Sequence, residues 1–144
     1  MKAKAEALGW SRLYESNEDF RLVFEQMHAA IERLPAELID RGRLLPFPQL
    51  HVACVEGELD LAEALLGAGV APDTYPCTED ENDEPPLVWL AKEEGMDPGV
   101  KIRVAGLLLA KGADIDEGGA LGAAEEIGDD DFARFLREFG AAET

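Results

Sequence analysis

Carboxylates are the side chains whose number and spacing in this sequence could support chemistry, and they are densest between residues 73 and 97. This segment contains nine Asp and Glu residues and a single Lys. Oxygen ligands at alternating positions, followed by a Gly and then a Glu, would form a calcium-binding loop. Asp80, Asn82 and Glu84 alternate, but Pro85 stands where the Gly is needed and no Glu follows at the required distance. The pattern therefore does not predict a calcium site.

The same segment is better interpreted as a surface that contacts a protein. Tyr75 and Trp89 lie close in sequence to the carboxylates, and aromatic anchors within a charged rim are typical of protein-binding sites. The alternative is a solvated loop without a partner. The predicted partner-binding residues are Asp73, Tyr75, Glu79, Asp80, Glu81, Asp83, Glu84, Trp89, Glu93, Glu94 and Asp97.

A second acidic run precedes Phe132 and comprises Glu125, Glu126, Asp129, Asp130 and Asp131. Acidic residues at a helix start accept hydrogen bonds from the first amides and complement the helix dipole. We therefore expect Asp129 to Asp131 to begin a helix, with partner contact as the alternative.

The histidines and cysteines do not form a recognisable site. His28, His51, Cys54 and Cys77 lack the close spacing of zinc ligands. We expect Cys54 to pack inside a helix pair and Cys77 to lie in a loop, without a disulfide, as in a reducing compartment. No nucleophile elbow, phosphate loop or dinucleotide fingerprint is present. We predict a protein that is not an enzyme, with no catalytic residue, no metal and no cofactor.

The charge balance restricts the class of partner. Thirty-one acidic residues stand against thirteen basic ones, for a net charge of −18 over 144 residues. Such a surface repels nucleic acid and anionic membranes, but attracts a basic protein. The alternative is that the charge serves solubility alone. Neither a signal-peptide core nor an apolar run of about 20 residues is present, so the sequence predicts a cytoplasmic protein.

Leu and Gly recur at equal spacings in two segments, which indicates an internal repeat. Leu50 precedes Gly57 by seven residues, and Gly57 precedes Gly69 by twelve. The same two spacings relate Leu121, Gly128 and Gly140. A middle copy extends from Leu87 to Gly112 and is six residues longer, with the insertion expected around residues 95–99. We expect Gly69, Gly112 and Gly140 to end helices in the left-handed conformation.

These segments resemble the ankyrin repeat. Three sets of residues match its pattern: Leu50-His51, Ala53, Gly57, Leu65-Leu66, Gly69 and Asp73; Pro86-Leu87, Ala91, Leu107-Leu108-Leu109, Gly112-Ala113-Asp114 and Asp116; Leu121, Ala124, Gly128, Phe132, Phe135-Leu136 and Gly140-Ala141. The resemblance implies an all-α solenoid of about three to four stacked helix pairs with helical caps. It also implies that His51 hydrogen-bonds locally and supports its turn. The connection from Asp73 to Leu87 exceeds the family's usual finger, so we expect an acidic loop that projects.

The expected organisation is a single ankyrin-repeat domain over residues 1–144. It divides into an N-terminal cap (1–15), a divergent first repeat (16–47), a repeat (48–73), a repeat with an insertion (85–116) and a C-terminal capping repeat (120–141). Within the divergent repeat, Ser16 is the expected cap of a helix, and Gly42 is the expected stop of a second one that Pro35 opens. Phe20, Phe24, Met27 and Ile31 share one face of the first helix. Trp10, Leu13 and Tyr14 are expected on a preceding helix that covers the exposed end.

Solenoids of this kind are mostly binding surfaces, which predicts a non-enzymatic protein-interaction module. We favour an acidic inhibitor, such as a bacterial immunity protein, that binds and neutralises a basic toxin or nuclease and is monomeric when free. The first alternative is a scaffold or adaptor whose acidity serves solubility only. The second is a nucleic-acid mimic, whose carboxylates stand in for phosphates.

Overall fold

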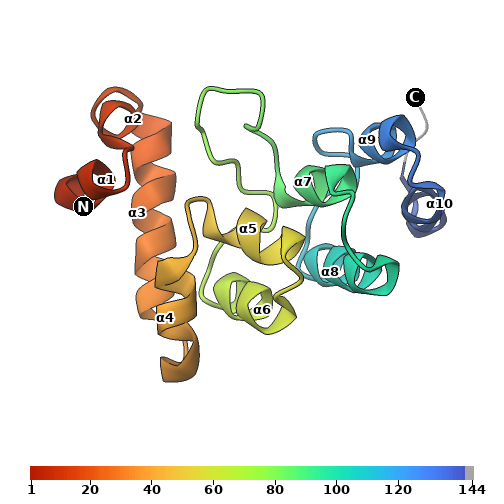
Figure 1. The fold of residues 1–144 in the computed structure, drawn as a ribbon, viewed down its shortest axis with the longest axis horizontal. Helices are drawn as coiled ribbons and strands as arrows, with labels where there is room; N and C mark the ends of the chain where they lie inside the picture. The colour runs from red at the N-terminus through yellow and green to blue at the C-terminus, as the bar shows by residue number, and fades with distance from the viewer. Residues whose placement is uncertain (142–144) are drawn as a thin grey trace.

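A computed structural model describes residues 1–141 of the chain, and these residues are all-α, with no strand among them (Figure 1). Within this described part, no helix is long and apolar enough to cross a lipid bilayer. The helices are α1 (Lys2–Ala7), α2 (Ser11–Ser16), α3 (Glu18–Glu32), α4 (Ala36–Leu44), α5 (Gln49–Val55), α6 (Leu59–Gly67), α7 (Pro86–Lys92), α8 (Pro98–Ala110), α9 (Ala120–Ile127) and α10 (Asp130–Phe139).

The helices from α5 onward form two rows. In one row α7 packs between α5 and α9, and in the other α8 packs between α6 and α10 (Figure 1). Ala53, Ala91 and Ala124 are fully buried, and their small side chains let the helices of the first row approach closely. Leu65, on α6, and Leu108, on α8, are also fully buried. The core therefore runs between the two rows along their length.

Aromatic side chains dominate the N-terminal end instead. The expected stripe on α3 is confirmed, because Phe20, Phe24, Met27 and Ile31 are all buried. The Phe47 ring lies 5.3 Å from the Phe20 ring and 5.4 Å from the Phe24 ring, centroid to centroid. Such aromatic pairs add attraction beyond the apolar area that they bury. This cluster fastens α3 to the segment that leads into α5.

Two predicted helix boundaries in this region are wrong. Asn17, not Ser16, caps α3, because its Oδ1 accepts a hydrogen bond of 3.0 Å from the Phe20 amide. The Ser16 hydroxyl donates backwards to the Arg12 carbonyl in α2. Gly42 does not end α4, which continues to Leu44. A Cβ at Gly42 would stand 3.0 Å from the Leu34 side chain, so glycine there permits close packing rather than a stop.

Other predicted boundaries are confirmed. Gly69, Gly112 and Gly140 lie within two residues of a helix end and have φ angles of 106°, 103° and 122°, which side chains disfavour. Helix α8 begins at Pro98, with the Asp97 carboxylate accepting a hydrogen bond from the Val100 amide. The α7–α8 connection (93–97) is two residues longer than the α5–α6 connection (56–58), and α8 has 13 residues against 9 in α6. The six extra residues of the middle copy therefore lie only partly around residues 95–99, as expected, and mostly lengthen α8, contrary to expectation.

A buried lysine that the sequence did not single out joins three helices. Lys101 on α8 is only 2% exposed. Its Nζ donates to the Glu93 carbonyl after α7 at 2.8 Å and to the Asp129 carboxylate before α10 at 2.7 Å. The ammonium also lies 4.8 Å from the centroid of the Phe132 ring. Because these partners replace water, the charge remains compensated inside the fold.

Candidate functional site

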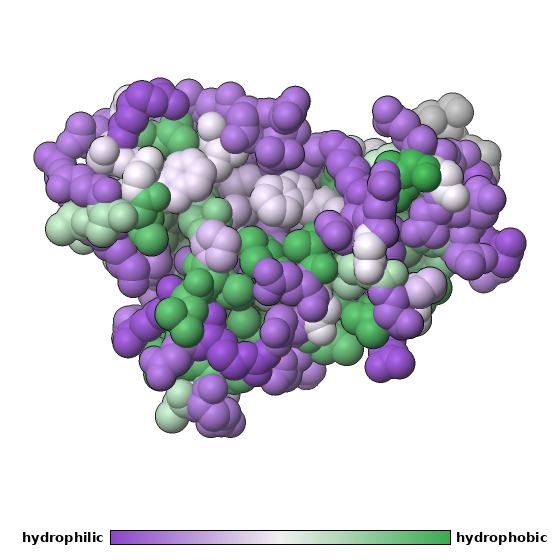
Figure 2. Space-filling view, viewed as in Figure 1, coloured by the Kyte–Doolittle hydropathy of each residue, from purple (hydrophilic) through white to green (hydrophobic). Residues whose placement is uncertain are grey.

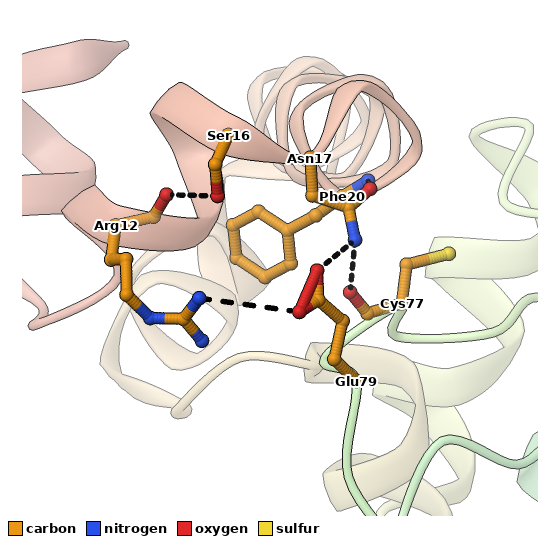
Figure 3. Close-up of polar contacts among 6 residues, drawn as sticks. All are labelled: Arg12, Ser16, Asn17, Phe20, Cys77 and Glu79. Atoms are coloured by element: carbon orange, nitrogen blue, oxygen red, sulfur yellow. Dashed lines mark hydrogen bonds and ion pairs between the residues drawn. The ribbon is translucent and has the colours of Figure 1, made fainter.

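The acidic loop between α6 and α7 does not project freely, contrary to expectation. Asn17 Nδ2 donates to Glu79 Oε1 at 2.9 Å and to the Cys77 carbonyl at 3.5 Å (Figure 3). Arg12 of α2 adds an ion pair to Glu79 at 4.0 Å (Figure 3). The long loop therefore reaches the N-terminal helices and is held there, because its tip offers acceptors to their donors.

Carboxylates of the loop also shape its own turns. Asp83 Oδ1 accepts a hydrogen bond of 2.8 Å from the Cys77 amide. Asp80 Oδ1 accepts from the Thr78 hydroxyl and from the Asn82 amide, each at 2.9 Å. Aspartate commonly stabilises turns by accepting from nearby backbone amides in this way. These two predicted partner-binding residues thus have structural roles inside the loop.

The start of the loop contacts the shorter connection between α8 and α9. Asp73 Oδ2 accepts a hydrogen bond of 2.8 Å from the Asp114 amide. The Tyr75 hydroxyl donates to the Glu117 carboxylate, and this bond, together with burial, raises the pKa of Tyr75 to about 12. Burial likewise raises the pKa of Asp73. Tyr75 is therefore engaged within the molecule rather than presented as a free anchor.

Trp89 lies elsewhere, on α7, and is half-buried. Its Nε1 donates to the Asn82 carbonyl at 2.8 Å, and its ring centroid is 4.8 Å from that of His51. His51 was expected to form a local hydrogen bond. Instead, its Nε2 donates a hydrogen bond of 2.8 Å to the carbonyl of Glu84, at the end of the long loop. Burial lowers the pKa of His51 to about 4, so the ring is neutral at pH 7.

The remaining predicted site residues are distributed around α7. Glu84 forms an ion pair with Lys92, and Asp97 caps α8. Glu93 offers its carbonyl to Lys101. Glu81 and Glu94 are exposed. The predicted residues consequently contact four different parts of the molecule: the N-terminal helices, the α8–α9 connection, α7 and α8.

Two adjoining hollows follow the junction of α5 and α7. One, of about 230 Å³, is lined by Val55, Asn82, Glu84, Trp89, Lys92 and Glu93. The other, of about 400 Å³, is lined by Val55, Glu56, Gly57, Glu93, Gly95, Met96, Asp97 and Val100. Because both are lined by Val55 and Glu93, we describe these two hollows together as the α5–α7 groove.

Sequence reasoning missed part of this groove. It singled out four of the lining residues from the acidic run, but not Val55, Glu56, Met96 or Val100. Those four come from α5, α8 and the connections next to them, and each is unremarkable in its own segment. These residues could have been identified from the sequence only if the packing of α5 against α7 had been predicted first. Figure 2 shows, on the face it presents, apolar surface over α5 and α6 with hydrophilic surface around it.

A further hollow of about 300 Å³ lies between α3 and the turn after α6. Its lining includes Val23, Met27 and Val70, and Arg33 crosses beside it to donate to the Ala68 carbonyl at 2.8 Å. No Asp or Glu lines this hollow. It is therefore separate from the acidic surface that the sequence indicated.

The second acidic run begins a helix as expected. Asp129 Oδ1 accepts a hydrogen bond of 3.1 Å from the Phe132 amide and caps α10. Burial opposes ionisation of Asp129, yet the hydrogen bonds from Lys101 and Phe132 hold its pKa below the usual value. Asp130 and Asp131 occupy the first turn of α10. Asp129, Asp130 and Asp131 therefore stabilise the helix start, whereas Glu125 and Glu126 lie on α9.

The cysteines and acidic groups show no arrangement for metal chemistry in the described part of the chain. Among residues 1–141, no three His, Cys, Asp or Glu side chains converge as a set of metal ligands. Cys54 is fully buried, and burial raises its pKa to about 12, which keeps the thiol protonated. Cys77 is a second free thiol, in the loop as expected.

The arrangement offers surfaces for contact: a loop stabilised by its own carboxylates and a groove that combines apolar side chains with an acidic rim. Both features belong to the region that the sequence indicated, although the groove extends beyond it to α5 and α8. Comparison of the chain with protein-family models, with curated proteins and with solved structures finds no match.

Proposed function

We propose that the protein is a non-enzymatic binding module that neutralises a basic protein, in the manner of a bacterial immunity protein acting on a toxin or nuclease. The observation that carries this proposal is the charge. Thirty-one acidic residues stand against thirteen basic ones, so the chain carries eighteen more negative than positive charges. A field of this sign accelerates association with a basic partner and disfavours acidic ones.

The proposal includes a fold, a divergent ankyrin-repeat solenoid. Three successive helix pairs support it, α5 with α6, α7 with α8 and α9 with α10, because each pair packs on the next through both rows. The hydrogen bond from His51 to the Glu84 carbonyl supports it as well, since it joins one pair to the loop that leads into the next. A single pair could not bury its own apolar face, so stacking is required for stability.

The ordered state of the acidic loop favours a binding role. Hydrogen bonds from Asn17, and to Asp80 and Asp83, hold the loop in one conformation before any partner arrives. A surface that is ordered in advance loses less conformational entropy on binding. The proposed surface therefore comprises the loop and the neighbouring α5–α7 groove.

The test is capture of the natural partner from cells that make this protein, followed by an activity assay. We expect the tagged protein to retain a basic protein at low salt and to release it at high salt, because surface charges are screened over about 8–10 Å at physiological ionic strength. Addition of the purified protein in equal amount should then abolish the activity of the captured partner.

Three results would contradict the proposal. A partner that stays bound at high salt with its activity intact would indicate a scaffold whose charge serves solubility. If no basic protein is captured, the negative charge does not serve to bind a basic partner as we propose. If DNA competes with this protein for the same site on the captured partner, the function is nucleic-acid mimicry instead.

A further inference from the structure

The α5–α7 groove has an apolar floor. Val55, Met96 and Val100 line it and are half-buried, Met96 and Val100 against the core, and Trp89 lines its other end. Trp89 is held in place because its indole N–H is bonded to the Asn82 carbonyl. At Gly57 a Cβ would stand 3.0 Å from Val100 Cγ1, so the absence of a side chain keeps this end of the groove open. Water is a poor occupant of such a floor.

The rim of the groove is acidic. Four carboxylates line it, those of Glu56, Glu84, Glu93 and Asp97, against the single ammonium of Lys92. That ammonium already pairs with Glu84. Among residues 1–141, no cation forms an ion pair with the carboxylate of Glu56 or Glu93, although Lys101 donates to the Glu93 carbonyl. The groove therefore holds negative charge that the described part of the chain does not compensate.

We propose that the α5–α7 groove binds an arginine-containing segment of the basic partner, with an apolar side chain next to the arginine. This proposal rests on the proposed function and names the part of the surface that recognises the partner. An arginine carries a planar cation on an apolar stem, so it can stack on an indole ring while the stem covers aliphatic surface. Trp89 supplies the ring, Val55 the aliphatic surface, and Glu93 a carboxylate on the rim that both hollows share.

Charge complementarity selects this occupant over a purely apolar one. An apolar segment would bury the floor but would also displace water from Glu56 and Glu93 without replacing the lost hydration. A guanidinium restores hydrogen bonds to carboxylates as it excludes water, and it does so with two parallel donors where the geometry allows. The neighbouring apolar side chain of the partner would then cover Met96 and Val100.

The experiment uses a short peptide of alternating arginine and leucine as its probe. The same peptide with citrulline in place of arginine keeps the shape but has no charge. The protein contains two tryptophans, so the Trp10→Phe variant makes Trp89 the sole indole reporter. We expect the arginine peptide to shift the Trp89 emission. The affinity of the citrulline peptide should be lower by at least about tenfold, since charged hydrogen bonds in a groove contribute one or more factors of ten.

A matched pair of double variants separates the groove from the overall charge. Glu56→Gln with Glu93→Gln removes two charges from the rim, whereas Glu63→Gln with Glu126→Gln removes two exposed charges from α6 and α9. We expect the first pair to weaken binding of the arginine peptide about tenfold and the second pair about twofold or less. Unfolding by urea checks that both remain as stable as the parent.

Equal weakening by the two pairs would overturn the proposal, because only total charge would then matter. Equal binding of the two peptides would overturn it in favour of an apolar occupant. Inhibition of the natural partner tests the proposed function separately from the groove. If the natural partner is still inhibited by the Glu56→Gln and Glu93→Gln variant as by the parent, the groove proposal fails while the function stands. If the peptide results hold and a basic partner binds without being inhibited, neutralisation fails as the function while the groove proposal stands.

Discussion

The carboxylates of the long loop and those on the rim of the α5–α7 groove have different surroundings. In the loop, Asp73, Asp80 and Asp83 accept hydrogen bonds from backbone amides, and Glu79 binds Asn17. On the rim, Glu56 and Glu93 form no ion pair within residues 1–141. The difference teaches that a dense run of acidic residues is not by itself a binding surface. Some of its carboxylates accept hydrogen bonds from backbone amides, and only the others are available to a partner.

The physical reason lies in the backbone of the loop. A long connection without a helix or strand leaves many amides that need acceptors. Aspartate supplies such acceptors at short range, which lets the loop take a fixed shape. Cys77 and Glu79 have φ angles of 57° and 63°, a conformation that L-residues seldom adopt, and the contacts of the loop offset that strain.

His51 lies between the loop and the groove, so acid should disturb both, and this is the largest effect that we expect. Burial lowers the pKa of His51 and of His28 to about 4, from 6.5 in the unfolded chain. The unfolded chain therefore takes up protons first, and stability is complete above pH 6.5 and falls as the pH drops towards 4. The loss approaches about 1.4 kcal/mol per pH unit for each histidine.

Urea unfolding at pH 7, 6 and 5 measures this slope. The His28→Phe variant keeps an aromatic ring next to Phe24, whose centroid is 4.5 Å from that of His28. With one titrating histidine removed, the slope between pH 6.5 and 4 should fall by about half. Stability that stays constant from pH 7 to pH 5 would show that the histidines are accessible to protons in the folded state.

The buried Lys101 should contribute more to the stability of the fold than Lys92, which lines the groove. Lys101→Met should lower the free energy of unfolding by about 3 kcal/mol, because it leaves Asp129 and the Glu93 carbonyl without their donor. Lys92→Met is the matched control, since its ion pair with Glu84 is half-exposed and contributes about 1 kcal/mol or less. Chemical denaturation of both variants provides the comparison, and equal losses would contradict it.

The anchor of the loop can be tested apart from the cap of α3, because Asn17 serves both. Asn17→Ala should lower stability by about 1 kcal/mol through loss of the cap. Asn17→Asp keeps the capping oxygen but places a carboxylate against Glu79. We expect hydrogen exchange of the amides of residues 74–84 to accelerate in both variants, while Asn17→Asp retains the stability of α3. Unchanged exchange in Asn17→Asp would show that the loop is held by other contacts.

The smallest effects separate the two sets of carboxylates directly. Asp83→Ala should cost about 1 kcal/mol, because the Cys77 amide loses its acceptor. Glu56→Ala on the rim of the groove should change stability by about 0.5 kcal/mol or less, because it removes an exposed charge without an ion partner. Thermal unfolding of the two variants under one condition measures both values. A larger loss at Glu56 than at Asp83 would reverse the distinction between the two regions.

Much of the helical pattern could be predicted from the sequence. The stripe from Phe20 to Ile31, the helix stops at Gly69 and Gly112, and the cap at Asp129 follow from local rules and are present. The predictions failed where two local signals competed. Ser16 and Asn17 are both capping residue types, but Ser16 ends α2 and donates to the Arg12 carbonyl, whereas Asn17 accepts from the Phe20 amide. Glycine often ends a helix, but Gly42 lies within α4, where the absence of a side chain allows close packing against Leu34.

By itself, the sequence determined the all-α class, the places where most helices begin and end, and the excess of negative charge. These properties follow from periodicity, capping and composition, which act over a few residues or sum over all of them. The tertiary structure alone decided that Asp73 accepts from the distant Asp114 amide and that the Glu56 and Glu93 carboxylates form no ion pair among residues 1–141. It also buried Lys101 between three helices and joined Val55 and Glu56 to Trp89 and Glu93 in one groove. Those outcomes depend on contacts between segments far apart in the chain, and no local pattern of residues encodes them.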